Sequence, residues 1–172
     1  MQQIPVTGYI KRFIEAQFGT GPYDLSYHHH HPLTVSFLCT HIYARLYPAP
    51  VAIERLNISL GSSDRLKKYF DEHEHIFNRG CFYCYQFFNT FYTEVDGRLE
   101  SFNELRESEV DLPRKYNRRT AIWEFMKRYN LDDEQVCQFE SLYRYYSFYN
   151  ARKNKHKQAR VLGFPNRIRR GA

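Results

Sequence analysis

The sequence has no long apolar run, and this absence narrows the classes of protein to which it can belong. No stretch approaches the roughly 18 consecutive apolar residues that a membrane-spanning helix needs. The first residues, MQQIPVTGYIKRFIEAQFG, contain polar and charged residues throughout, without the regions that make up a signal peptide. We therefore expect an intracellular protein with no membrane partner, located in the cytoplasm or in an assembled particle such as a virion. Its four cysteines are then expected to be reduced thiols.

The usual signatures of catalysis are also missing. The sequence contains no Gly-rich phosphate-binding loop, no GxSxG nucleophile elbow and no HExxH metal motif. Asp71, Glu72 and Glu74 lie close to lysines in a helical pattern, which is typical of a solvated helix face. We therefore predict that the protein is not an enzyme, that it has no catalytic residues and that it needs no cofactor.

Acidic residues are absent from the C-terminal end of the chain, where the last acid is Glu140. Residues 1–140 carry 16 Lys and Arg against 19 Asp and Glu, a net charge of −3, whereas residues 141–172 carry 9 against none. The two parts together give the net charge of +6. Concentration of the positive charge at one end favours a polyanion or an acidic surface as partner.

The composition predicts one compact domain that is mainly α-helical. Hydrophobic residues make up 42% of the 172 residues and aromatic residues 17%, which is enough to bury a core. We expect a globular domain of about five helices over residues 1–150 and an extended basic arm over residues 151–172. The expected helices are Pro5–Phe18, Pro32–Tyr47, a third from a cap at Ser62 or Ser63 to just before Gly80, a fourth from Arg118 to Tyr129, and a fifth from Asp132 to about Lys157.

Capping residues mark the two C-terminal helices. Asn117 is expected to cap the helix that ends near Tyr129. Asp132, with Gln135 three positions later, forms a capping-box pattern at the start of the last helix. The apolar positions of these two helices are expected to face inward: Ile122, Trp123, Met126, Tyr129, Val136, Phe139, Leu142, Tyr143, Tyr146 and Tyr149.

Two segments fit more than one secondary structure. Residues 51–60 alternate like a short strand at Leu56, Ile58 and Leu60 but also fit a helix. Residues 81–95, CFYCYQFFNTFYTEV, have the aromatic content of a strand, which would place a β-hairpin near residues 91–102. A helix is slightly favoured for this segment because the rest of the chain is helical. Residues 101–115, with mixed charge and a proline, resemble a connector.

Two groups of residues offer potential metal ligands. Neighbouring side chains in the run His28–His31 point apart, so a loop that binds metal adventitiously explains the run better than a functional site. Cys81 and Cys84 have the spacing of a zinc knuckle, and His73 and His75 precede them. The two histidines would point to different helix faces, and large aromatics surround the cysteines. A small zinc protein is therefore kept only as an alternative, and no metal is predicted.

The C-terminal residues 150–172, NARKNKHKQARVLGFPNRIRRGA, include eight Lys or Arg. Apolar residues are interspersed among these basic residues. This pattern suits an extended arm that lies in a groove of a neighbouring subunit while its arginines pair with acids or phosphates. The predicted residues for binding nucleic acid or a partner are Arg144, Arg152, Lys153, Lys155, Lys157, Arg160, Phe164, Arg167, Arg169 and Arg170.

These patterns predict a non-enzymatic structural component of a larger assembly that contains nucleic acid, for example a phage-type virion or a head–tail connector. Its partners would be other protein subunits, in a homo-oligomer or a hetero-assembly, and nucleic acid. The first alternative is a stand-alone DNA- or RNA-binding module resembling a helix-turn-helix. Acids at the start of the last helix would repel phosphate, so this alternative implies non-specific phosphate contact. A solvated basic tail with no partner is the remaining possibility.

Overall fold

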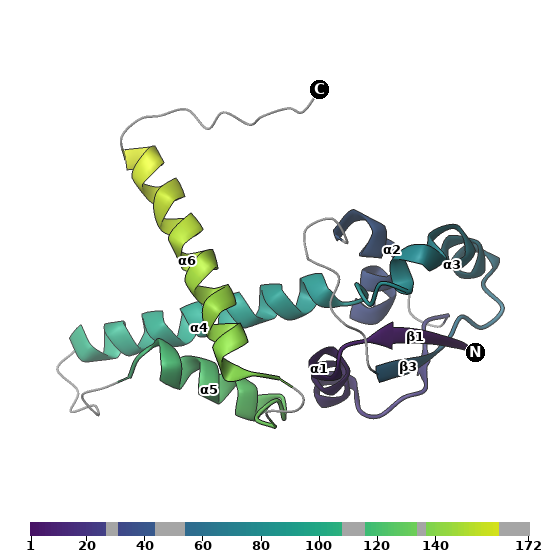
Figure 1. Ribbon diagram of the computed structural model, residues 1–172, viewed down its shortest axis with the longest axis horizontal. Coiled ribbons are helices and arrows are strands. Elements are labelled where there is room, and N and C mark those ends of the chain that lie inside the picture. Colours follow the sequence, from purple (N-terminus) through teal and green to yellow (C-terminus); the bar gives the residue numbers. More distant parts are fainter. Residues whose placement is uncertain (27–30, 44–53, 108–115, 134–136, 162–172) are drawn as a thin grey trace.

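The computed structural model describes residues 1–26, 31–43, 54–107, 116–133 and 137–161 (Figure 1). Residues 43, 106–107 and 156–161 are described by their backbone alone. Within these ranges there are six helices and one three-stranded sheet. The prediction of a mainly helical protein is therefore confirmed.

The sheet is built from the N-terminal part of the chain. β1 (Gln2–Val6) runs antiparallel to β3 (Glu54–Ser59), and the short β2 (Tyr23–Asp24) pairs parallel to β3 on its other side. The strand reading of residues 51–60 is therefore correct for β3. The prediction that a helix starts at Pro5 is wrong, because Pro5 lies inside β1. An edge strand tolerates proline because its missing N–H can face away from the neighbouring strand.

Three helices pack with this sheet. α1 (Gly8–Phe18) follows β1, α2 (Pro32–Tyr43) follows β2, and α3 (Asp64–Phe77) follows β3. The cap predicted for the third helix is confirmed at Ser63, whose hydroxyl accepts a hydrogen bond from the Leu66 N–H. Gly80 lies just past this helix with φ of +70°, the left-handed conformation that glycine adopts readily.

The long helix α4 (Cys84–Glu107) resolves the ambiguous aromatic segment. The slightly favoured helix is correct for this segment, and the β-hairpin considered as the alternative near residues 91–102 is not formed. Phe87, Phe91 and Val95 recur every four residues on one buried face of this helix. The connector expected from residue 101 also begins later, because α4 continues to Glu107 and residues 108–115 lie outside the described ranges.

Two helices complete the C-terminal part. α5 (Arg118–Arg128) is capped as predicted by Asn117, whose side-chain oxygen accepts from the Arg119 N–H at 2.9 Å. α6 (Phe139–Val161) starts seven residues later than the predicted cap at Asp132. Gln135 lies outside the described residues. The connection carries Leu131 and Cys137 into the core, and this burial competes with an early helix start.

The inward positions of α5 and α6 are mostly as predicted. Ile122, Met126, Tyr129, Leu142 and Tyr146 are buried, and Phe139, Tyr143 and Tyr149 pack against the core while partly exposed. Val136 lies outside the described residues. Trp123 is the exception, because 39% of its surface is exposed and its ring stacks on Phe139 at the surface.

One hydrophobic core joins the N-terminal and C-terminal parts. Phe13 of α1 contacts Phe87 of α4 at a centroid distance of 5.1 Å and Tyr129, just after α5, at 4.6 Å. α6 crosses α4, and the C-terminal half of α6 projects from the body (Figure 1). Residues 151–161 of the predicted arm therefore continue a helix, and residues 162–172 lie outside the described part. None of the helices in the described ranges is long and apolar enough to span a bilayer.

Candidate nucleic-acid interface

The inner face of α6 is fastened to α4 mainly through one carboxylate, Asp96, which accepts three hydrogen bonds from α6. The Tyr146 hydroxyl donates to Asp96 at 2.5 Å, the Tyr149 hydroxyl donates at 3.1 Å, and the Lys153 ammonium donates at 2.5 Å. Tyr149 also stacks almost parallel on Tyr92, with ring centroids 4.2 Å apart. These contacts span about two turns of α6 and fix its direction relative to the body.

Asp96 is held in its charged form. Burial raises the pKa of this carboxyl group, but the hydrogen bonds from Lys153, Tyr146 and Tyr149 and the charge of Lys153 outweigh burial, so the pKa falls below its ordinary value. Lys153, predicted as a binding residue, also lies 3.9 Å from Glu100. The structure therefore places Lys153 in an intramolecular anchor.

Two further carboxylates, Glu94 and Glu124, join α4 to α5 and to the residue that follows α5. Glu94 accepts a hydrogen bond from the Tyr129 hydroxyl and lies 3.2 Å from Arg128, which ties α4 to the end of α5. Glu124 on α5 pairs with Arg98 on α4 at 2.6 Å. Acidic side chains of α4 and α5 are thus engaged in holding the helices together.

The outer face of α6 has a different composition. We define it by Arg144, Phe148, Arg152 and Lys155, which are separated by four, four and three residues and so share one side of the helix. All four side chains are exposed, and Phe148 is 63% exposed. At a rise of about 1.5 Å per residue the outer face extends over about 16 Å.

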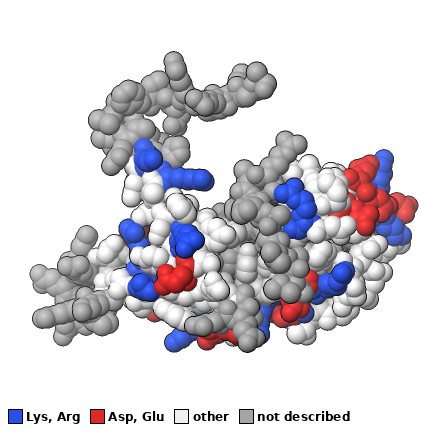
Figure 2. All heavy atoms as spheres, viewed as in Figure 1, with Lys and Arg blue, Asp and Glu red and all other residues white. Residues whose placement is uncertain are grey.

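Glu140, one turn before Arg144, is the acidic residue of α6 that lies nearest to the outer face. No Asp or Glu follows Glu140 in the sequence, and Glu140 itself pairs with Arg119 at 2.8 Å. None of the described acidic side chains forms an ion pair with Arg144, Arg152 or Lys155. Figure 2 shows Lys and Arg atoms, without Asp or Glu atoms, at the end of α6 that projects from the body. The outer face is therefore a site of uncompensated positive charge.

The structure separates the predicted binding residues into four groups. Arg144, Arg152 and Lys155 lie together on the outer face, whereas Lys153 lies on the inner face. Lys157 and Arg160 belong to α6 by their backbone. The remaining four predicted residues lie outside the described ranges: Phe164, Arg167, Arg169 and Arg170.

Sequence reasoning missed Phe148 as part of this face. Helical periodicity could have predicted its exposure, because residues two positions apart in a helix differ by about 200° and so point in nearly opposite directions. With Tyr146 assigned to the core, Phe148 had to face outward. Tyr145 is a second partly exposed ring, packed edge-on against Phe88 at 5.1 Å.

The potential metal ligands that the structure describes do not come together in one site. Among the described residues, no group of three or more His, Cys, Asp or Glu side chains could hold a metal ion. His73 Nδ1 lies 2.9 Å from the Tyr69 carbonyl oxygen. Burial raises the pKa of the Cys81 thiol, and burial together with the nearby Cys81 raises the pKa of the Cys84 thiol to about 12. These cysteines therefore act as protonated core residues.

The histidine run is described only at its last member. The His31 ring packs against Phe18 at a centroid distance of 4.9 Å, and its Nδ1 accepts a hydrogen bond from the Leu33 N–H at 3.2 Å. His28, His29 and His30 lie outside the described residues. His31 thus has a local structural role at the start of α2.

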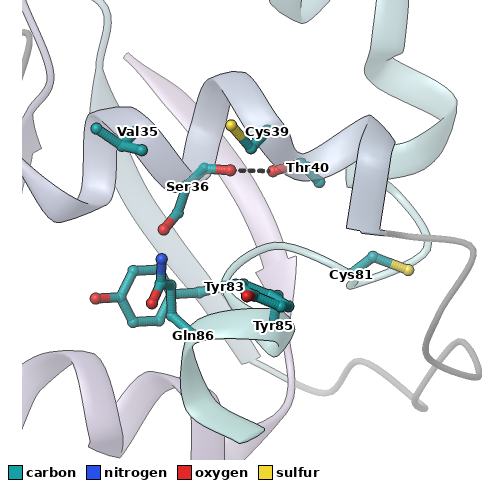
Figure 3. Close-up of a pocket in the computed structure, with 8 residues that line it drawn as sticks. All are labelled: Val35, Ser36, Cys39, Thr40, Cys81, Tyr83, Tyr85 and Gln86. Atoms are coloured by element: carbon teal, nitrogen blue, oxygen red, sulfur yellow. Dashed lines mark hydrogen bonds between the residues drawn. The ribbon is translucent and has the colours of Figure 1, made fainter. Parts of the chain in front are cut away.

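A small cavity of about 50 Å³ lies between α2 and the start of α4 (Figure 3). Ser36, only 6% exposed, points its hydroxyl toward Tyr83 and Gln86, and this oxygen has no hydrogen-bond partner among the described residues. The cavity is far smaller than the roughly 300 Å³ typical of small-molecule sites. It can hold a few water molecules that satisfy Ser36. Its lining residues are Val35, Ser36, Cys39, Thr40, Cys81, Tyr83, Tyr85 and Gln86.

The candidate site is therefore the outer face of α6, a charged and partly aromatic surface on a helix that is anchored from its other side. No family model, curated protein sequence or solved structure gives a significant match to this chain.

Proposed function

We propose that the protein is a non-enzymatic component of a larger nucleic-acid-containing assembly, such as a virion, and that the outer face of α6 contacts the phosphate backbone. One observation carries this proposal. Arg144, Arg152 and Lys155 are exposed along one side of α6 and form no ion pair with a described acidic side chain, while Lys153 on the opposite side is anchored to Asp96. The fold thus neutralises the inward cation and leaves the outward cations available.

Phosphate is the anion that this arrangement suits best. Arg and Lys side chains bind phosphate oxygens and release condensed counterions, so such contacts give affinity without reading sequence. The helix is already fixed by its inner face, so binding requires little further ordering of the backbone. The acids near the start of α6 are paired with other cations, because Asp133 lies 3.6 Å from Arg12 and Glu140 lies 2.8 Å from Arg119.

The non-enzymatic part of the proposal rests on how the reactive groups are used. The carboxylates Glu94, Asp96 and Glu124 are engaged with basic or tyrosine partners between helices. Burial raises the pKa of the Cys137 thiol to about 12, which leaves it protonated at neutral pH. These four side chains thus have structural roles.

Attachment to neighbouring subunits is assigned to the last segment of the sequence. Residues 160–170 contain Val161, Leu162, Phe164, Pro165 and Ile168 among four arginines. Apolar residues at irregular spacing with proline and glycine suit an extended segment that lies in a groove of another subunit. The proposal therefore divides the C-terminal end into a nucleic-acid contact on α6 and a protein contact after it.

Fluorescence anisotropy with labelled DNA and RNA tests the phosphate contact. We compare the full chain with the triple variant Arg144→Gln, Arg152→Gln and Lys155→Gln at salt concentrations from about 50 to 200 mM. We expect the variant to lose about tenfold or more in affinity, and its salt slope to fall by about two to three because up to three phosphate contacts are removed.

The matched control removes three exposed cations from α3 instead, with Arg65→Gln, Lys67→Gln and Lys68→Gln. It makes the same change in net charge on a different surface. Equal losses in the two variants would show that net charge and not the outer face determines binding, and would contradict the proposal. Truncation after residue 161, followed by measurement of mass in solution and of co-purifying proteins, tests the assigned subunit contact.

A further inference from the structure

We infer that the outer face of α6 binds unpaired nucleic acid in preference to duplex, with a base stacked on the Phe148 ring. The inference rests on the proposed function and deepens it by naming the class of nucleic acid. Its basis is an exposed aromatic ring between two cations that form no ion pair within the described part of the chain, on a helix whose other side is fixed.

The exposure of Phe148 is not explained by the packing of the protein. Its ring is 63% exposed, and no described ring packs against it. The other aromatic residues nearby on α6 have ring partners in the body: Tyr145 contacts Phe88, Tyr146 contacts Phe91 and Tyr149 contacts Tyr92. Covering this ring in a complex would be favourable, because it would remove apolar surface from water.

The cations beside Phe148 indicate what covers it. Arg144 lies one helical turn before the ring and Arg152 one turn after it, so a nucleotide placed on the ring would have its neighbouring phosphates near a guanidinium on either side. Tyr145 lies three residues before Phe148 on the adjacent strip of the helix and is 39% exposed. Aromatic rings interleaved with basic side chains form the usual surface for single strands.

The ring discriminates between single strands and duplexes because of where the base faces are. In a duplex the faces are covered by neighbouring base pairs, and a side chain on a helix can reach only the groove edges and the backbone. In a single strand the faces can be exposed, and stacking accepts any base because each base has a π-face. We therefore expect a preference for single strands with little dependence on sequence.

The test measures the affinities of the full chain for a single-stranded dT20 oligonucleotide and for a 20-base-pair duplex. Phe148→Leu keeps an apolar side chain but removes the aromatic face, and we expect it to weaken dT20 binding about five- to tenfold. Duplex affinity should change by less than about twofold, because phosphate contacts alone hold the duplex. Phe148→Tyr should restore dT20 binding.

Ile42→Ala is the matched control, because Ile42 is an exposed apolar residue on α2, far in sequence from α6. It should leave both affinities unchanged. Equal binding of single strand and duplex by the unmodified chain, or an equal loss for both ligands with Phe148→Leu, would overturn the inference while the proposed function stands. Absence of salt-sensitive binding to either ligand would overturn both.

Discussion

The two faces of α6 carry the same kinds of residue and use them differently. Lys153 and Arg152 are neighbours in the sequence, yet the Lys153 ammonium lies 2.5 Å from Asp96 while Arg152 is exposed without a described acidic partner. Tyr146 and Phe148 differ in the same way, one buried at 2% exposure and the other exposed at 63%. The number of basic residues in a tail therefore does not tell how many are available to a partner, because the acids of the facing helix determine that.

The two faces should differ most in how much the loss of one apolar side chain lowers the free energy of unfolding. Leu142→Ala removes a buried side chain from the inner face and should lower the free energy of unfolding by about 2–4 kcal/mol, because a cavity remains. Phe148→Ala should change it by less than about 0.5 kcal/mol, because the ring is exposed. Denaturant unfolding followed by circular dichroism measures both, and equal losses would erase the distinction between the faces.

The next effect concerns the carboxylate that anchors the inner face. Asp96→Asn removes the negative charge that accepts hydrogen bonds from Tyr146, Tyr149 and Lys153. It should lower the free energy of unfolding by about 2 kcal/mol. Glu100→Gln is the control, since its carboxylate lies 3.9 Å from Lys153 and its side chain is 70% exposed. If both variants have the same stability, Asp96 is not the anchor.

Substitutions at the adjacent residues Arg152 and Lys153 compare the two faces directly. Arg152→Gln should weaken nucleic-acid binding about threefold and leave thermal unfolding unchanged, because one exposed cation is lost. Lys153→Gln should do the reverse, with nearly unchanged binding and a loss of about 1 kcal/mol in stability, because a partly buried ion pair is removed. Anisotropy and thermal melts on the same samples would show whether the two effects separate, and a binding loss for Lys153→Gln alone would reverse the assignment.

The smallest effect is the pH dependence of the Asp96 anchor. The pKa of Asp96 is lower in the folded than in the unfolded protein, so its charge stabilises the fold above about pH 4, and this contribution is lost as the pH falls through the folded pKa. The stability difference between the unmodified protein and Asp96→Asn should be constant between about pH 5 and 8 and shrink below about pH 4. A difference that grows toward acid would mean that the carboxylate is not stabilised in its charged form.

The sequence correctly predicted those helix ends that are set by a capping residue at the end itself. Ser63 caps α3, Asn117 caps α5, and Gly80 takes the left-handed conformation after α3, as expected. The predictions of secondary structure were wrong where contacts with residues distant in the sequence determine the structure. Pro5 lies in a strand because β3, some fifty positions later, pairs with it, and α6 starts late because Leu131 and Cys137 are drawn into the core. Residues 84–107 form a helix although their aromatic content also suits a strand, because one face of that helix fits the core.

The candidate site was predictable in part for the same reason. The basic character of the last helix is evident from the sequence, and helical periodicity places Arg144, Phe148 and Lys155 opposite Tyr146. The separate role of Lys153 is not evident, since it depends on Asp96, which lies 57 positions earlier. Only the packing of α6 across α4 brings these two residues together.

The most direct test of the central claim is to map where nucleic acid touches the protein. Ultraviolet crosslinking of the full chain to dT20, followed by proteolysis and mass spectrometry, identifies the residues that contact bases. We expect crosslinks in the peptide that contains Phe148, and their loss from that peptide in the triple variant of Arg144, Arg152 and Lys155. Crosslinks concentrated on α3 or on the N-terminal sheet, with none on α6, would contradict the account.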